Sequence, residues 1–466
     1  MKTSIKTPPP VGAAQQISIT ANDPLAFTFH PKQAEYELSE KRFVWIPAAR
    51  RTGKTWIAKR RGVKKALQNT TWPDCRIAFC APTYSQVKRI YWDDLKRMLT
   101  AVEGGVIQDK SESELMIRLV NGSEIWLIGM DKPDRFEGSS WNWVFADEVA
   151  NMKPKAIEQH IMPALSERLG GLDQYGVPEG MNHYYRSCMY AQEEENKHEC
   201  DFFWWTAREV MPIYLGEEIA EQEIARAQKR MDDLTFRQEY EAEFIHFVGK
   251  AYHAFDRTVQ ASDRLLYDPQ APLHLCFDFN VEPGVCIVIQ EGREQRGDRR
   301  KDVTLIIDEV TIRKNSTTPL VSRAIGEKYK GHKGQVYLYG DATGGARGSA
   351  KVRGSDWDLI KEELMPYFGN RMTFRVPRRN PPERVRVNAV NSRFRSSSGV
   401  VRMLIDPSKA PDTATDFDEV VVVDGGSGEI DKKANSDRTH HSDAVGYYVF
   451  RRHPVGGGYK IENKQI

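Results

Sequence analysis

Residues 45–55 read Trp-Ile-Pro-Ala-Ala-Arg-Arg-Thr-Gly-Lys-Thr, and this stretch decides the fold of the N-terminal half of the chain. The apolar residues 43–46 lead into it and the helix-compatible residues 56–67 follow it, which predicts the order strand, loop, helix. A loop in that position surrounds phosphate groups with backbone N–H groups, and the dipole of the helix behind it favours anions. Lys54 is predicted to reach the terminal phosphates of a nucleotide, and the Thr55 hydroxyl to hold Mg²⁺.

This loop alone is a weak signal, because Gly-Lys-Ser/Thr occurs by chance in chains of this length. The usual pattern also has a glycine five residues before Gly53, where this chain has Ala48. An ordinary strand-to-helix turn would therefore read the same way. The decisive partner is a second apolar strand, residues 141–146, that ends in adjacent carboxylates. Asp147 can help to hold Mg²⁺ and Glu148 can polarise the attacking water, so the two stretches together predict nucleotide hydrolysis.

Composition describes an ordinary globular protein. The 466 residues, 40% apolar and 28% charged, suffice for two large domains or about three smaller ones, and the net charge of +2 identifies no partner. The six cysteines never fall at a C-x-x-C spacing, which favours buried free thiols. No signal peptide or apolar run near 18 residues is present, so we expect a protein of the reducing cytoplasm without a membrane partner.

Gln33 lies shortly before the loop strand, in the sequence Phe-His-Pro-Lys-Gln. Its amide carries a donor and an acceptor and could read adenine, although a surface glutamine that opens a helix would look alike.

A second group of carboxylates lies in the C-terminal half. Apolar strands are predicted over residues 273–279, which carry Asp278, and residues 335–340, which end at Asp341; Asp443 falls in the first turn of an apolar helix. Taken singly, such aspartates are turn residues or helix caps. Together they would form an all-oxygen site for Mg²⁺ or Mn²⁺, in which two ions activate water and stabilise the leaving oxygen of a phosphodiester.

Two neighbouring features bear on that site. His440 and His441 are adjacent on one helix, so at most one of them should face the metals. Residues 371–402 hold nine arginines against one acid, Glu383. A solvated basic face is the usual explanation for such a run, but this one is placed to grip a phosphate backbone without reading sequence.

The order of these parts resembles the large subunit of tailed-phage terminases, over about residues 25–450. The phosphate loop with its arginines (residues 49–55) is similar to that family's loop. Further similar segments are residues 135–138, 163–168 and 176–185 in the first half, and 380–388 and 441–444 in the second. Ala48 departs from the family's glycine, so a Cβ must be tolerated there, and Val177 departs from the usual threonine or serine of the coupling motif.

The resemblance implies roles for individual residues. Gln33 would read adenine, Arg50 would sense the γ-phosphate, and Arg135 would be an arginine finger for a neighbouring subunit. The nucleotide would be held by the loop and the acidic strand, through Arg50, Arg51, Thr52, Gly53, Lys54, Thr55 and Asp147, with Glu148 as catalytic base. The nuclease metals would be held by Asp278, Asp341 and Asp443, with Glu309 as a further ligand or neighbour.

The resemblance also implies an α/β architecture with a P-loop (ASCE-type) ATPase domain, built on a parallel sheet, over residues 25–215. A helical linker (216–264) and an RNase H-like nuclease domain (265–452) follow, between a flexible arm (1–24) and a flexible tail (453–466).

The expected activity is ATP-driven translocation of double-stranded DNA into a procapsid, with Mg²⁺- or Mn²⁺-dependent cleavage of concatemeric DNA. The expected partners are the portal protein, a small terminase subunit and further copies in a ring, commonly five, in the host cytoplasm. Two alternatives remain open: a helicase-like ATPase–nuclease of DNA repair or defence, and an assembly protein in which one or both sites are dead.

Overall fold

The computed structural model describes residues 30–102, 104–278, 283–296, 299–342, 355–424, 426, 428–435 and 438–455. The predicted arm and nearly all of the predicted tail lie outside this range. The chain forms two compact units, one made of residues up to Ile224 with Arg237–Ile245, the other of Ala225–Phe236 with the residues from His246 onward. The segment predicted as a helical linker is thus divided between the units.

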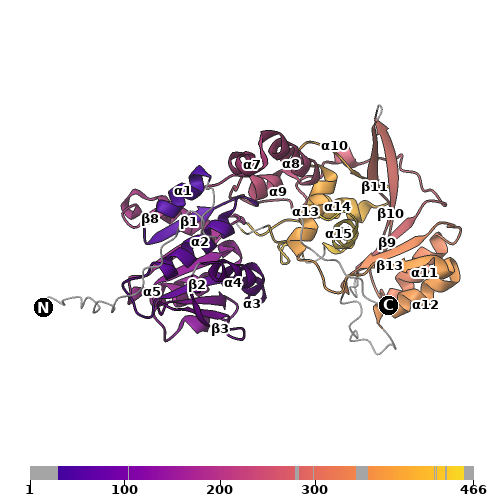
Figure 1. Ribbon diagram of the computed structural model, residues 1–466. Helices are drawn as coiled ribbons and strands as arrows, with labels where there is room; N and C mark the ends of the chain where they lie inside the picture. Colours follow the sequence, from indigo (N-terminus) through magenta and orange to yellow (C-terminus); the bar gives the residue numbers. More distant parts are fainter. Residues whose placement is uncertain are drawn as a thin grey trace. The chain divides into compact units, whose positions relative to one another are not determined.

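An eight-stranded sheet forms the first unit, in the order β3-β4-β5-β2-β6-β7-β1-β8 (Figure 1). Its strands are β1 (Phe43–Pro47), β2 (Arg76–Ala81), β3 (Ile107–Ser111), β4 (Met116–Leu119), β5 (Glu124–Gly129), β6 (Trp143–Asp147), β7 (Gly171–Gly176) and β8 (Cys200–Phe202). In this order the neighbouring strands from β5 through β2, β6, β7 and β1 to β8 run parallel, and β4 and β5 form an antiparallel hairpin around Asn121 and Gly122. Strand β7 lies between the loop strand β1 and the acidic strand β6, which is the predicted ASCE-type arrangement.

Helices cover this sheet. They are α1 (Pro31–Leu38), α2 (Lys54–Leu67), α3 (Tyr84–Val87), α4 (Asp93–Thr100), α5 (Met162–Ser166), α6 (His183–Gln192) and α7 (Ala207–Leu215), followed by α8 (Glu217–Arg230) and α9 (Asp233–Tyr240). Helix α2 lies so close to the sheet that a Cβ on Gly62 would stand 2.4 Å from the Phe79 ring. The helix that starts at the phosphate loop is therefore fixed directly against strands β2 and β6.

A six-stranded sheet forms the second unit, in the order β13-β12-β9-β10-β11-β14. Its strands are β9 (Leu273–Asp278), β10 (Gly284–Arg296), β11 (Arg299–Ile312), β12 (Val336–Gly340), β13 (Met372–Phe374) and β14 (Met403–Ile405). Strands β9, β10 and β11 are antiparallel, whereas β12 and β13 run parallel to β9. This is the strand order of the predicted RNase H-like fold.

The two faces of the second sheet differ in chemistry. Leu273, Leu275 and Phe277 share a core with Ile325 and Ile360, from the helices α11 (Thr318–Lys328) and α12 (Asp356–Phe368). The alternating residues of β9 face the other way, where α15 (His440–Arg452) packs, near α13 (Glu383–Phe394) and α14 (Pro411–Glu419) (Figure 1). One short helix, α10 (Arg257–Gln260), precedes the sheet. Since β9 is buried on both faces, it reads as a continuous apolar run.

The structure bears on the cysteines and on membrane-spanning segments, both of which were considered from the sequence. All six cysteines are buried and unpaired, as predicted. Within the described residues, no helix has both the length and the apolar character needed to cross a membrane.

Candidate nucleotide and metal sites

The phosphate loop has two residues in the left-handed region, Arg51 (φ 64°) and Gly53 (φ 75°). Ala48 is buried with a negative φ, so the Cβ that replaces the usual glycine is accommodated, as predicted. Lys54 begins helix α2 and is 8% exposed. The Thr52 hydroxyl donates to the Ala49 carbonyl over 2.9 Å, so this residue holds the loop's own shape.

Thr55 joins the loop to the acidic strand. Its hydroxyl donates to Asp147 Oδ2 over 3.1 Å, and the Tyr91 hydroxyl donates to the same oxygen over 2.8 Å. Tyr91 in turn shares a 2.7 Å hydrogen bond with Tyr175. Burial raises the pKa of Asp147, while the charge of Lys54 and these hydrogen bonds oppose that rise. The carboxylate is thus fixed beside Lys54 and Thr55.

Glu148 follows at the end of β6 with φ 54°, a strained value for a residue with a side chain. Burial raises its pKa, the charge of Lys54 lowers it, and the neighbouring charge of Asp147 raises it again. A Cβ on Gly176 would lie 3.1 Å from the Glu148 Cα, so the segment that resembles the coupling motif begins against this residue. His183 Nε2 lies 3.1 Å from the carbonyl oxygen of Val149, the residue that follows Glu148.

Arg50, a residue of the loop, contacts Glu239. The two form an ion pair, and the Arg50 N–H also donates to the Glu239 carbonyl over 2.8 Å. The charge of Glu239 is the main reason that the pKa of Arg50 is raised, and that of Glu148 contributes. The Arg51 carbonyl accepts a hydrogen bond from Tyr214. Both loop arginines therefore contact residues from the end of the first unit.

Gln33 lies directly on the loop, in helix α1. Its Nε2 donates to the Gly53 carbonyl over 3.3 Å, and its Oε1 accepts from the His30 N–H. Arg135 is exposed, in a short turn (Pro133–Phe136) between β5 and β6, with its guanidinium 5.7 Å from the Tyr84 ring centre. Adenine reading by Gln33 and the finger role of Arg135 stay predictions.

The second unit brings the three predicted aspartates to one end of its sheet. Gly340 on β12 pairs with Phe277 on the parallel strand β9, so Asp341 and Asp278 lie side by side at the strands' carboxyl ends. Asp341 accepts a 2.6 Å hydrogen bond from Asn380. Asp443 enters from the first turn of α15, which packs on the same strands.

The charges of the three aspartates all act on one buried side chain, Tyr447. Burial is the main reason that the pKa of Tyr447 is raised; Arg386 lowers it, and Asp341, Asp278 and Asp443 each raise it further. The pKa of Asp443 itself is raised by burial and by Asp278, against the charge of Arg386. Arg386 Nη1 lies 2.8 Å from Asp443 Oδ1, but without hydrogen-bond geometry, since that buried oxygen has no hydrogen-bond donor among the described residues.

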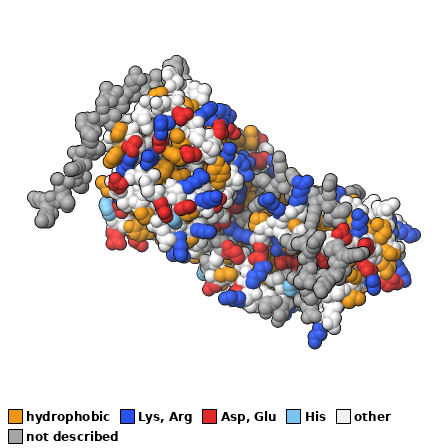
Figure 2. Space-filling view, turned by 90° about the horizontal axis from the view of Figure 1, so that it is seen from below, with side chains coloured by type: hydrophobic (Ala, Val, Ile, Leu, Met, Phe, Trp, Pro, Cys, Tyr) orange, Lys and Arg blue, Asp and Glu red, His pale blue; other side chains and the backbone are white. Residues whose placement is uncertain are grey.

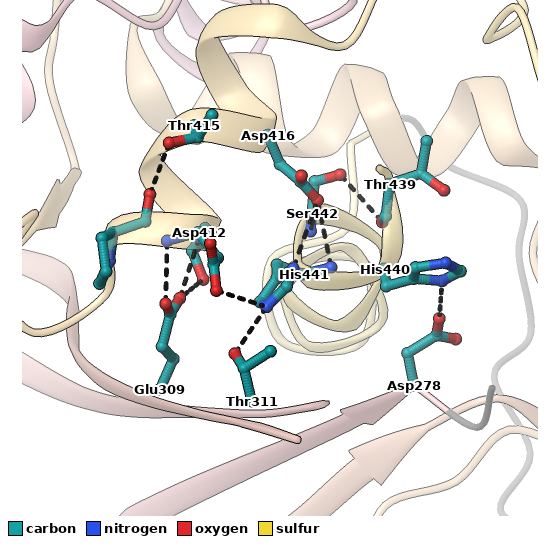
Figure 3. Close-up of polar contacts among 12 residues, drawn as sticks. Asp278, Glu309, Thr311, Asp412, Thr415, Asp416, Thr439, His440, His441 and Ser442 are labelled. Carbon is teal, nitrogen blue, oxygen red and sulfur yellow. Dashed lines mark hydrogen bonds and ion pairs between the residues drawn. The ribbon is translucent and has the colours of Figure 1, made fainter. Parts of the chain in front are cut away.

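The adjacent histidines point apart, as predicted (Figure 3). His440 Nδ1 lies 3.0 Å from Asp278 Oδ2, and this contact raises the histidine's pKa. His441 turns to the other side, where its Nε2 lies 2.9 Å from the Thr311 hydroxyl.

Glu309 lies in that second cluster, away from Asp278 in Figure 3. Its oxygens accept from the N–H groups of Asp412 and Thr413 over 2.8 and 2.9 Å, at the start of helix α14. Glu309, Asp412 and His441 are the described residues whose potential ligand atoms approach within 4.8 Å of one another. Arg313 already binds both oxygens of Asp412 at 2.7 Å. The geometry gives Glu309 a capping role, and its role as a metal ligand stays a prediction.

Some arginines of residues 371–402 make contacts inside the second unit, and others are exposed. Arg371 donates to three backbone carbonyls, and Arg386 and Arg393 are buried against Asp443 and Glu291. Arg378, Arg379 and Arg395 are exposed. The expected basic face is therefore narrower than the count of nine suggests. On the face drawn in Figure 2, Lys and Arg side chains alternate with Asp and Glu instead of gathering in one patch.

Comparison with known proteins found a family model that covers part of the chain. Residues 46–259 match the model described as terminase large subunit, T4likevirus-type, N-terminal. This match supports a terminase large subunit. A curated relative, the terminase large subunit of Escherichia phage T5, is 25% identical over 258 residues, which are 55% of either chain. The alignment thus spans about half the length of this relative.

Solved large terminases have the same fold. A structure of the large terminase from a thermophilic bacteriophage covers 91% of this chain and 99% of its own, with a TM-score of 0.61 at 17% identity. Structures of that same phage protein with ADP and with ATP-gamma-S give TM-scores of 0.60 and 0.59 at 16% identity. At these identities the likeness establishes the fold of this chain, and it confirms the prediction of two α/β units.

Several contacts of the terminase site were not predicted from sequence. Each joins residues that are far apart in the sequence. Tyr91 binds Asp147 and also Tyr175. Glu239 binds Arg50, and Arg386 binds Asp443. Tyr91 reads as one of the apolar positions of its helix, and Arg386 as one of nine similar arginines. Asn380 contacts Asp341, but the sequence marks it only as part of residues 380–388, a segment similar to terminase large subunits.

Proposed function

We propose that this terminase large subunit hydrolyses ATP to drive double-stranded DNA into a procapsid and cuts the concatemer with a metal-dependent nuclease. The observation that carries the proposal is the pairing of two phosphate-handling centres in one chain. One joins Lys54 and Thr55 to Asp147; the other gathers Asp278, Asp341 and Asp443 at the end of a separate sheet.

The first centre suits a nucleotide with Mg²⁺. Thr55 and Asp147 supply the two oxygens that a P-loop site offers to this ion, and they already lie 3.1 Å apart. Bound there, Mg²⁺ would neutralise charge on the β- and γ-phosphates. Lys54 would bind the same phosphates, and Glu148 would orient and deprotonate the attacking water.

The second centre suits Mg²⁺ or Mn²⁺. Its donors are carboxylate oxygens, and the buried Asp443 Oδ1 lacks a hydrogen-bond donor among the described residues. Burial and the neighbouring charge of Asp278 raise the pKa of Asp443, and a bound cation would relieve the repulsion between the two carboxylates. Bound ions would activate water against a phosphodiester. His440 would fix the orientation of Asp278.

The similarity to terminase large subunits supports the remaining partners: a portal, a small terminase subunit and a ring of copies, in the host cytoplasm. DNA protection tests the proposal directly. The protein, matching empty procapsids and ATP should shield DNA from an added nuclease, and omission of ATP should abolish this protection. Strand separation without capsid-dependent protection would support a helicase-like ATPase–nuclease instead.

A further inference from the structure

We propose that two arginine-lined cavities beside the C-terminal end of α15 form a track for the phosphate backbone of DNA at the nuclease unit. This inference rests on the proposed function, because it takes the polyanion to be the DNA that the nuclease cuts.

The first cavity has a volume of about 320 Å³. Its walls include Arg375, Arg451 and Arg452, together with His274 and Tyr337. The second cavity, of about 340 Å³, includes Arg230, Arg393 and Arg402. Arg452 lines both cavities, so the two hollows share a wall and form one basic surface within the second unit.

Negative charge is scarce along this surface. Glu291 is the one carboxylate among the described residues that line either cavity. It is already bound by Tyr448, by His453 over 3.0 Å and by Thr304 over 2.8 Å. Burial raises its pKa, but the contacts with His453 and Tyr448 and the charge of Arg393 outweigh burial and lower the pKa to about 2. Among the described lining residues, positive charge therefore exceeds negative charge in both cavities.

The arginines repel one another. Burial and the charge of Arg375 lower the pKa of Arg451. Burial and the charge of Arg230 likewise lower the pKa of Arg402. An anion bound between such groups would remove this repulsion, and phosphate oxygens are the natural partners of guanidinium groups.

Two of these arginines suit ligand binding better than the others. Arg393 and Arg402 donate to the backbone carbonyls of Asp302 and Lys229, so they stabilise the walls. Arg375 lies 5.5 Å from the ring centre of Tyr337, which stacks on His274 at 16°. Within the described part of the chain, neither Arg375 nor Arg452 forms an ion pair with a carboxylate. Both line the first cavity, so their charges are available to a ligand there.

The track also lies on the correct face of the sheet. His274 precedes Asp278 by four residues on β9, and Tyr337 precedes Asp341 by four on β12, so all four share the α15 face. Four residues of strand span about 13 Å. A DNA strand that passes the aspartates can therefore place a phosphate a short distance upstream in the arginine cavity. Such contacts fix position without reading bases.

Salt-dependent DNA binding tests the track. The full-length protein would be titrated onto a labelled duplex of random sequence in EDTA, which prevents cleavage, over a range of salt concentrations. Each lost phosphate contact reduces the slope of log K against log salt by about 0.9. The Arg375→Gln/Arg452→Gln variant should therefore lose about 2 from the slope, and the Arg375→Lys/Arg452→Lys variant should keep it. Arg323→Gln, on α11 at the opposite face, is the matched control and should bind like the wild type.

The outcomes separate the inference from the proposed function. A wild-type protein that binds no DNA contradicts both. Wild-type binding with an unchanged slope in the double glutamine variant overturns the track alone. Lysine variants as defective as the glutamine variant would indicate a packing role and also overturn it. Displacement of the duplex by inorganic phosphate at constant ionic strength would assign the cavities to a free anion rather than to DNA.

Discussion

The Thr55 hydroxyl donates a hydrogen bond to the carboxylate of Asp147 over 3.1 Å, which links the phosphate loop to the acidic strand. Thr55 lies in the helix that follows strand β1, and Asp147 is the last residue of β6. Strand β7 separates β1 from β6, so the contact depends on the correct order of the sheet. Removing only the hydroxyl therefore examines the nucleotide site with little change in shape.

Thr55→Val should lower ATP hydrolysis by on the order of a hundredfold, the size of one lost transition-state contact. The valine cannot offer an oxygen to Mg²⁺ and leaves the buried Asp147 with one donor fewer. Thr55→Ser keeps the hydroxyl and should stay close to wild type. Steady-state hydrolysis at several Mg²⁺ concentrations measures the difference, and equal activity of the two variants would refute the assigned role.

Glu239→Gln should lower the KM for ATP. In the structure Arg50 is paired with Glu239, and we expect this pair to compete with a contact between Arg50 and the γ-phosphate. Arg50 is largely exposed, so the pair contributes about 1 kcal/mol or less, equivalent to a KM change of up to about fivefold. Arg50→Ala is the comparison and should lower kcat. An unchanged or higher KM in Glu239→Gln would show that the pair supports the nucleotide-binding form.

Glu309→Gln separates a helix cap from a metal ligand. Because Glu309 accepts from two N–H groups at the start of α14, the variant should lose about 1 kcal/mol of unfolding free energy and retain DNA cleavage. Denaturant unfolding and a plasmid nicking assay give the two readings. Lost cleavage at unchanged stability would restore the metal-ligand role predicted from sequence.

The second unit should lose stability in mild acid through His274. Burial lowers the pKa of this histidine to about 4, so the folded protein keeps it neutral while the unfolded chain protonates near its ordinary value. The contribution of neutral His274 to the free energy of unfolding is therefore complete above the unfolded-state pKa of about 6.5. It is lost as the pH falls from there through the folded-state pKa, and the total loss is on the order of 3 kcal/mol.

Amide exchange of the β9 and β12 peptides at about pH 7 and pH 5 measures this loss. His274→Gln should reduce the difference between the two pH values. His441, whose pKa burial also lowers to about 4, remains in the variant and accounts for a residual slope. An undiminished difference in the variant would contradict the role of His274.

Local sequence patterns predicted the elements that carry the chemistry. The loop before α2, the acidic end of β6, the aspartates at the ends of β9 and β12, and the opposed directions of His440 and His441 follow from strand ends and helix geometry. These features depend only on residues that are close together in the chain, so they can be predicted from one sequence.

The supporting contacts depend on pairs far apart in the chain. Arg50 and Glu239 are 189 residues apart, and Tyr91 and Asp147 are 56 apart. Nothing in the local sequence distinguishes Arg386 from the other arginines of its run, although the fold places its guanidinium beside Asp443. Glu309 shows the opposite problem. The sequence pattern suggests a metal ligand, but folding brings the start of helix α14 to this carboxylate, which caps the helix.

If two independent phosphate-handling centres share this chain, one substitution in each centre should separate ATP hydrolysis from DNA cleavage. Both activities would be measured on Lys54→Ala and on Asp278→Asn. We expect Lys54→Ala to abolish hydrolysis but still cut DNA, and Asp278→Asn to abolish cutting but still hydrolyse ATP. Retention of both activities in either variant would show that the substituted residue is not needed for the activity assigned to it.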